Sequence, residues 1–143
     1  MSAFGSKQLK ASNCNEVLPN NDGSINTVII SGAVSGNQKF FSGIATSTPG
    51  TQQVLITYIV PLGKTLTIYI YQLAFSFDSD VEVLINGTVI ASGKTGPLVH
   101  KDSFSWIKGR PIIAGETLEL KFKAQSWTPT AQDVEAYIEG VET

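Results

Sequence analysis

Two short runs of the sequence hold most of the residue types that catalysis would need. One is His100-Lys101-Asp102-Ser103, which contains the residue types of a hydrolytic triad. Because adjacent residues of an extended chain point in alternating directions, this run favours a loop over a catalytic relay. The other is Asp78-Ser79-Asp80, whose side-chain oxygens could hold a hard cation. Two carboxylates and a hydroxyl are too few to specify calcium, and Asp and Ser are also ordinary turn residues.

Other reaction classes have even less support in the sequence. A zinc site needs several His or Cys ligands, and the chain has one of each. Most of the twelve carboxylates fall on predicted outward strand positions or in turns, which does not favour the facing pair of a glycoside hydrolase. No glycine-rich phosphate loop precedes a predicted helix. We therefore expect a protein that is not an enzyme and that holds no cofactor or metal.

Composition narrows the classes of partner. Charged residues make up 15% of the 143 residues, below the roughly 25% of an ordinary soluble domain. The net charge is −2 and Arg110 is the only arginine, so no basic face for nucleic acid is expected. The apolar runs are far shorter than the ~20 residues of a membrane-spanning helix. Since no apolar stretch follows Lys7, we also expect synthesis in the cytoplasm without a signal peptide, and no membrane partner.

A regular series of short strands is predicted over residues 36–143. Residues 117–124 alternate between apolar and polar side chains, as a half-buried strand does. In residues 81–91 two alternating runs flank Asn86-Gly87, the strongest short-range signal for a hairpin. No segment has a convincing helical periodicity. The pattern predicts an all-β fold, an eight-stranded antiparallel sandwich that is jelly-roll-like.

One turn sequence occurs twice in this body. The two copies are Pro61-Leu62-Gly63-Lys64-Thr65-Leu66-Thr67-Ile68 and Ile113-Ala114-Gly115-Glu116-Thr117-Leu118-Glu119-Leu120. The glycine supplies the turn position that prefers positive φ. We interpret the copies as two equivalent strand entries within one sandwich.

Residues 1–35 are predicted to form an extended N-terminal arm. Their apolar residues are isolated or paired until Val28-Ile29-Ile30, so the segment cannot bury a core of its own. A short strand predicted over Ile25 to Ser31 has no local partner, which favours its addition to a sheet of a neighbouring subunit. A disordered terminus is the alternative. The candidate anchoring residues are Leu18, Pro19, Ile25, Val28, Ile29 and Ile30.

Exposed aromatic residues are the remaining functional lead. The apolar pattern of residues 64–77 changes phase, and a bulge near Tyr71-Gln72 would direct Tyr69 and Tyr71 outward as a candidate subunit interface. Alternatively, both faces of this strand are buried. Trp127 and Tyr137 are candidates for a glycan-stacking platform, because flat amphipathic rings serve sugar and protein partners alike.

Two stretches resemble tailed-bacteriophage virion structural proteins. Leu18-Pro19-Asn20-Asn21-Asp22-Gly23-Ser24-Ile25-Asn26 looks like the arm of many such proteins. Val60 to Ile68, followed by the Asn86 to Ile90 hairpin, is similar to the sandwich body of head decoration proteins and fibre domains. The resemblance implies a virion subunit, often a homotrimer, whose arm reaches a capsid lattice or an adjacent copy.

Two functions follow as expectations. The first is a non-enzymatic capsid decoration (cement) protein on the virion surface, which binds itself and the major capsid protein lattice or other virion proteins. The alternative is a carbohydrate- or receptor-binding sandwich of a tail fibre or tail tip.

Overall fold

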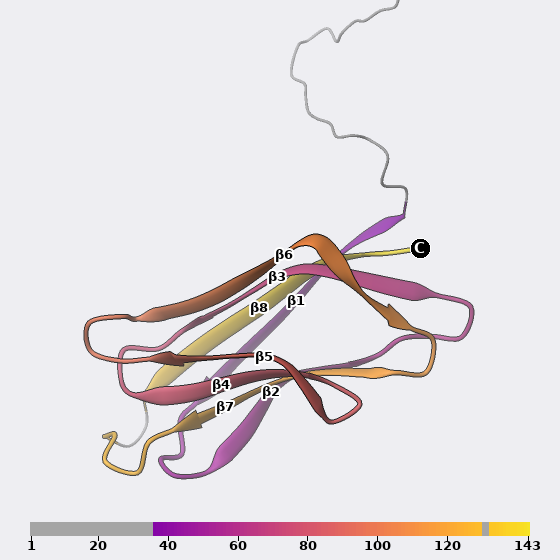
Figure 1. Ribbon diagram of the computed structural model, residues 1–143. Coiled ribbons are helices and arrows are strands. Elements are labelled where there is room, and N and C mark those ends of the chain that lie inside the picture. Colours follow the sequence, from indigo (N-terminus) through magenta and orange to yellow (C-terminus); the bar gives the residue numbers. More distant parts are fainter. Residues whose placement is uncertain (1–35, 130–131) are drawn as a thin grey trace, which may run out of the picture. The chain divides into compact units, whose positions relative to one another are not determined.

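Eight β-strands and no helix make up the part of the chain that the computed structural model describes, residues 36–129 and 132–143 (Figure 1). The arm predicted over residues 1–35, with its six candidate anchoring residues, lies outside the described residues. The strands are β1 (Asn37–Thr46), β2 (Gln52–Ile59), β3 (Thr65–Ala74), β4 (Ser79–Ile85), β5 (Thr88–Thr95), β6 (Lys101–Ile113), β7 (Thr117–Ala124) and β8 (Asp133–Glu142).

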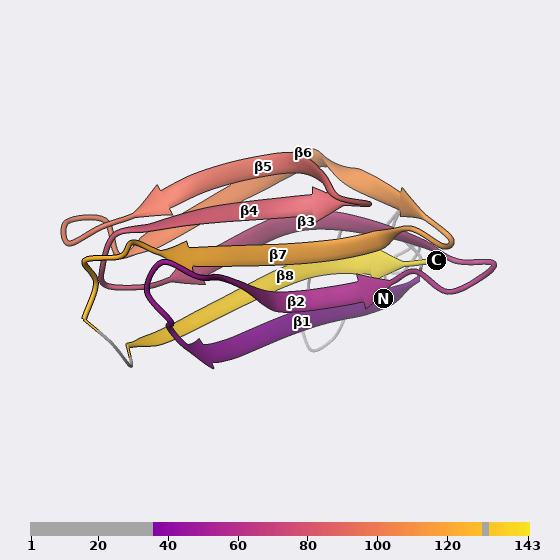
Figure 2. The same ribbon diagram turned by 90° about the horizontal axis from the view of Figure 1, so that it is seen from below.

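The strands form two four-stranded sheets that face each other (Figures 1 and 2). Sheet A has the order β1-β8-β3-β6, sheet B has the order β2-β7-β4-β5, and every pairing is antiparallel. The first strand pairs with the last, the second with the seventh, the third with the sixth and the fourth with the fifth. This nesting is a long hairpin rolled up across two sheets, the jelly-roll arrangement. The predicted eight-stranded antiparallel jelly roll is therefore confirmed.

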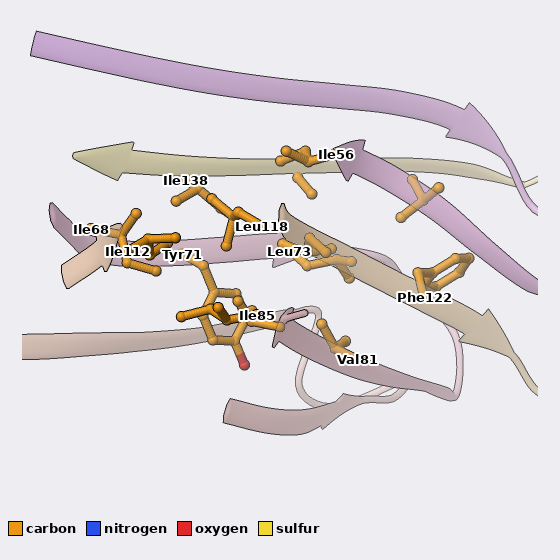
Figure 3. Packing of buried hydrophobic residues seen from close by; sticks show 14 of the residues in the cluster. Ile56, Ile68, Tyr71, Leu73, Val81, Ile85, Ile112, Leu118, Phe122 and Ile138 are labelled. Atoms are coloured by element: carbon orange, nitrogen blue, oxygen red, sulfur yellow. The ribbon is translucent and has the colours of Figure 1, made fainter. Parts of the chain in front are cut away.

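The core lies between the sheets and follows the alternation of the sequence. On β7 every second side chain, from Leu118 to Ala124, is completely buried, and on β8 the same holds for Val134 and Ile138. Side chains from both sheets meet in one cluster (Figure 3). Full burial of one large apolar side chain contributes about 1.5–3 kcal/mol, so the two inward-facing rows supply much of the stability of this fold.

The predicted hairpin joins β4 to β5, since Ile85 pairs with Thr88. Asn86 and Gly87 have φ angles of 50° and 79°. A two-residue type I′ turn requires positive φ at both positions. The conformation of this connection is therefore determined by its two turn residues, Asn86 and Gly87.

The repeated turn sequence forms the same turn twice. Lys64 N donates to Pro61 O over 3.1 Å, and Glu116 N donates to Ile113 O over the same distance. Gly63 and Gly115 occupy the third position of each turn with φ of 80° and 87°, as a type II turn requires. One copy leads from β2 to β3 and the other from β6 to β7, so both cross between the sheets.

The two turns lie side by side at one end of the sandwich. Val60 N donates to Glu116 O and Gly115 N donates to Val60 O, at 3.0 and 2.8 Å. This proximity follows from the topology, because β2 pairs with β7 and β3 pairs with β6. The interpretation of two equivalent strand entries in one sandwich fits this arrangement.

Strand β3 changes phase earlier than the sequence suggests. Its register with β6 and with β8 shifts between Ile68 and Ile70, which places the bulge at Tyr69. A bulge moves every later side chain to the other face, so Ile70 turns outward and Tyr71 turns inward. The expected outward position of Tyr71 is wrong: its side chain is 1% exposed and lies among core residues of both sheets (Figure 3).

Candidate functional site

Tyr71 belongs to a buried polar contact and not to the surface. Its hydroxyl donates a hydrogen bond to the Asp102 carboxylate on β6, and its ring packs against Trp106 with centroids 6.2 Å apart. Burial, followed by this hydrogen bond, raises the pKa of the Tyr71 phenol far above its usual value. Tyr69 is half-buried at the bulge. The structure therefore does not bring the two tyrosines together as an exposed pair.

The run His100 to Ser103 is split in the same way. The His100 ring lies 2.6 Å from Pro97 O in its own loop, whereas Asp102 points to Tyr71. Ser103 pairs with Gln72, on the opposite face of sheet A from Tyr71. The side chains diverge, as alternation along an extended chain requires.

An apolar surface covers the outside of sheet A over β1, β8 and β3. We call it the sheet A patch, and it consists of Phe40, Ser42, Ile44, Gln72, Ala74, Glu135 and Tyr137. The Phe40 and Tyr137 rings are stacked, with centroids 5.3 Å apart and an interplanar angle of 23°. Phe40 is 63% exposed and Ile44 is 78% exposed. The patch surrounds a shallow hollow of about 220 Å³.

Tyr137 is held in place at the centre of this patch. Its hydroxyl donates to Oε1 of Gln72 on β3, over 3.3 Å, while Phe40 covers one side of its ring. The neighbours of Tyr137 are therefore an aromatic ring and an amide, which leaves an amphipathic surface of the kind common at protein interfaces.

A second hollow is formed by residues of the β3–β4 connection, of β4 and β5, and of the β7–β8 connection. These elements meet at one end of the sandwich (Figure 2). We call this site the Trp127 hollow; it has a volume of about 300 Å³ and is lined by Asp78, Ser79, Lys94, Thr95, Gln125 and Trp127. Trp127 is 70% exposed, yet its indole Nε1 donates to Asp78 Oδ2 over 2.9 Å. The ring therefore projects into solvent in a defined orientation.

A chain of polar contacts through Asp80 connects two residues that line the Trp127 hollow, Lys94 and Gln125. Lys94 Nζ lies 2.5 Å from Asp80 Oδ1, and Gln125 Nε2 donates to Asp80 Oδ2 over 2.9 Å. The hydrogen bond from Lys94, with a smaller contribution from Gln125, lowers the pKa of the Asp80 carboxyl. The same bond raises the pKa of Lys94. Both groups therefore stay charged at neutral pH.

Buried hydroxyls form the floor. Ser79 and Thr95 are hydrogen-bonded to each other over 2.5 Å, and Thr95 Oγ1 also donates to Phe77 O. The backbone beneath Trp127 is tied down as well, because Gln125 N donates to Asp78 O and Thr128 N donates to Gln125 O, each over 3.0 Å. The hollow is thus built on a rigid base.

The outer face of sheet B differs from that of sheet A in charge. A hollow of about 440 Å³ there is lined by Gln52, Asp80, Val81, Glu82, Ser92, Gly93, Lys94 and Lys123. It adjoins the Trp127 hollow through Lys94. The hollow on sheet B is therefore lined mainly by polar and charged residues, whereas the sheet A patch is mainly apolar and aromatic.

Trp127 and Tyr137 do not form one platform. Trp127 lines the hollow at the loop end, Tyr137 lines the sheet A patch, and the two sites share no residue. The structure does not bring these two glycan candidates together, because Trp127 belongs to the β7–β8 connection and bonds to the β3–β4 connection, while Tyr137 lies within β8.

Sequence reasoning missed several residues of both sites. Phe40 and Ile44 alternate with Phe41, which faces the core, so the strand pattern alone leaves open which of its two apolar sets is outside. The partners of Trp127 were missed because Asp78 is 49 residues away. Neither signal is local in the sequence.

The described part of the chain contains neither a metal-binding group nor a membrane-spanning helix. Within residues 36–129 and 132–143, no three His, Cys, Asp or Glu side chains come together as a metal-binding group. The same residues contain no helix that is long and apolar enough to cross a membrane.

Comparisons with known proteins add the following. No family model matches the chain, and no curated protein matches it. Among solved structures it is similar to part of the insecticidal delta-endotoxin Cry8Ea1 from Bacillus thuringiensis, with a TM-score of 0.43 and 15% sequence identity. The match covers 65% of this chain and 18% of the toxin chain.

Proposed function

We propose that this protein is a non-enzymatic structural subunit of a tailed-phage particle, a capsid decoration protein whose sandwiches associate with one another through the sheet A patch. The observation that carries the proposal is the exposure of Phe40 and Ile44 on the outside of a jelly roll whose core is otherwise complete. Contiguous exposed apolar surface of this kind marks interaction sites. Segment 1–35 anchors the subunit to the particle.

A second copy of the chain is the occupant that the charges of this face favour. One row across sheet A reads Ile44, Glu135, Ala74, Lys101, in the strand order β1, β8, β3, β6. The face thus presents a carboxylate and an ammonium group on either side of an apolar position. A surface that carries both signs can complement a copy of itself, with an apolar centre and a polar rim.

Two further features support a place in a phage particle. Jelly rolls are a recurrent architecture of viral capsid domains, although lectin domains share it. The segment Leu18 to Asn26 resembles the arm of phage structural proteins. Many weakly bound copies on one lattice stabilise the assembled state by mass action, which is the physical work of a decoration protein.

Self-association is tested with Ile44→Lys and a matched control. Val54 is also an exposed β-branched residue, but it lies on β2 at the edge of sheet B. We expect the wild type and Val54→Lys to form the same oligomer, a homotrimer by the phage resemblance, in light scattering coupled to size exclusion. Ile44→Lys should be monomeric with an unchanged melting temperature. A monomeric wild type, or equal oligomers in all three proteins, would contradict the proposal.

Anchoring is tested by removing residues 1–35. The remaining sandwich should fold and oligomerise, because the core cluster lies within residues 36–143. It should no longer bind particles that lack the protein, as measured by co-sedimentation with them. Normal co-sedimentation of the shortened chain would show that anchoring lies elsewhere.

A further inference from the structure

We propose that the Trp127 hollow binds an uncharged saccharide through stacking of a pyranose ring on the Trp127 indole. The site is separate from the sheet A patch and shares no residue with it. Saccharide binding therefore does not depend on self-association, and either proposal can fail alone.

The indole is prepared for stacking. Trp127 is the most exposed aromatic residue in the described part of the chain. Its Nε1 already donates a hydrogen bond to Asp78. The hydrogen bond holds the ring without covering its face. A ring that is oriented before binding loses little conformational entropy when a ligand stacks on it. The apolar face of a sugar ring matches such a flat amphipathic surface.

Polar groups beside the ring suit sugar hydroxyls. Gln125 uses Nε2 to bind Asp80, which leaves its Oε1 turned to other donors, and Lys94 keeps protons beyond the one that it gives to Asp80. The hollow thus combines an acceptor, a donor and an aromatic face within about 300 Å³. A few placed polar groups around an apolar surface are the usual composition of a small-ligand site.

Charge selects the class of saccharide. Asp78 contributes the one carboxylate of the lining, and Lys94 contributes one ammonium group, which is paired with Asp80 beside the hollow. The remaining carboxylate of Asp78 would repel a sialic or uronic acid placed against Trp127. An uncharged hexose or N-acetylhexosamine meets no such repulsion.

The test uses the full chain and a glycan array of neutral hexose and N-acetylhexosamine oligosaccharides beside sialylated and uronic-acid oligosaccharides. Hits are then titrated by calorimetry and by tryptophan fluorescence. We expect neutral glycans to bind, and Trp127→Ala to weaken binding by about tenfold or more with an unchanged melting temperature. Trp127→Phe should lose less affinity than Trp127→Ala, because phenylalanine keeps an aromatic ring for stacking. It should still bind more weakly than the wild type, because it lacks the hydrogen bond to Asp78 that orients the ring.

Phe104→Ala is the matched control, because Phe104 is an exposed aromatic residue outside both the hollow and the sheet A patch, and its affinity should equal that of the wild type. Three results would overturn the proposal: no saturable binding of any neutral glycan, binding confined to acidic glycans, or an equal loss in Trp127→Ala and Phe104→Ala. Ile44→Lys serves to separate the two proposals. It should abolish self-association and leave the affinity per site unchanged.

Discussion

Replacing Tyr71 with Phe removes one hydroxyl from the core and tests the register of β3. The Tyr71 ring is fully buried, so Phe fills the same space and leaves no cavity. The lost interaction is the hydrogen bond to the Asp102 carboxylate. Hydrogen bonds to charged groups contribute about 1.5–3 kcal/mol net. Asp102 is only half-buried, so water can replace the phenol, and we expect the lower end, about 1.5 kcal/mol.

The assay is urea unfolding followed by circular dichroism. Tyr71→Phe should lower the midpoint without changing the slope, as a loss of stability alone does. Tyr69→Phe is the control, since Tyr69 lies half-buried at the bulge and its hydroxyl forms no hydrogen bond with another described residue. It should change the free energy of unfolding by less than about 0.5 kcal/mol.

Gly93→Ala, on β5, should disrupt the same contact between Tyr71 and Asp102. A methyl group added at Gly93 would overlap the Asp102 carboxylate, which must then leave Tyr71. The double variant Tyr71→Phe, Gly93→Ala should therefore cost less than the sum of the single variants. If Tyr71→Phe were neutral while Tyr69→Phe were costly, the bulge would lie beyond Tyr71 and the inward position of Tyr71 would be wrong.

Two further predictions concern pH and the repeated turn. The hydrogen bond from Tyr58 and then the ion pair with Lys39 lower the pKa of Glu142, so this contribution to stability is lost as pH falls through the folded pKa. The same contact raises the pKa of Tyr58 to about 12, so its contribution is lost as pH rises from the usual tyrosine value toward about 12. Tyr58→Phe should flatten the melting temperature at both ends of the pH range, and an unchanged profile would contradict the assignment. Gly63→Ala and Gly115→Ala should each lower the free energy of unfolding by about 1–2 kcal/mol in urea unfolding, because both positions have positive φ, which an alanine adopts only with strain. The space around both positions is open, so the added methyl group causes no clash and the strain alone sets the cost. Clearly unequal costs would show that the two turns are not equivalent.

The parts of the fold that local sequence determines could be predicted. The Asn86-Gly87 hairpin depends on two residues, and β7 has one apolar and one polar face, so its alternation has a single solution. Strand β3 is apolar on both sides and has two solutions. Its bulge lies opposite residues 106–109 of β6, which fall between the partners of Ile68 and Ile70. That contact is distant in sequence, and it decided the direction of Tyr71.

The same distinction applies to the candidate sites. Trp127 was recognisable as an aromatic residue in a loop, whereas its bond to Asp78 depends on two connections meeting at one end of the sandwich. Tyr137 was correctly placed on the outer face of β8, but its stacking partner Phe40 comes from the far end of the described chain. The residue types were readable, and their grouping required the topology.

The most direct test of the proposed role is a cryo-electron microscopy reconstruction of the phage particles on which the proposal places this protein. We predict density for the jelly roll on the particle surface, with Phe40 and Ile44 covered by another copy of the chain and with residues 1–35 traced against the underlying lattice. Particles without this density, or a bound jelly roll whose sheet A patch faces solvent, would contradict the account.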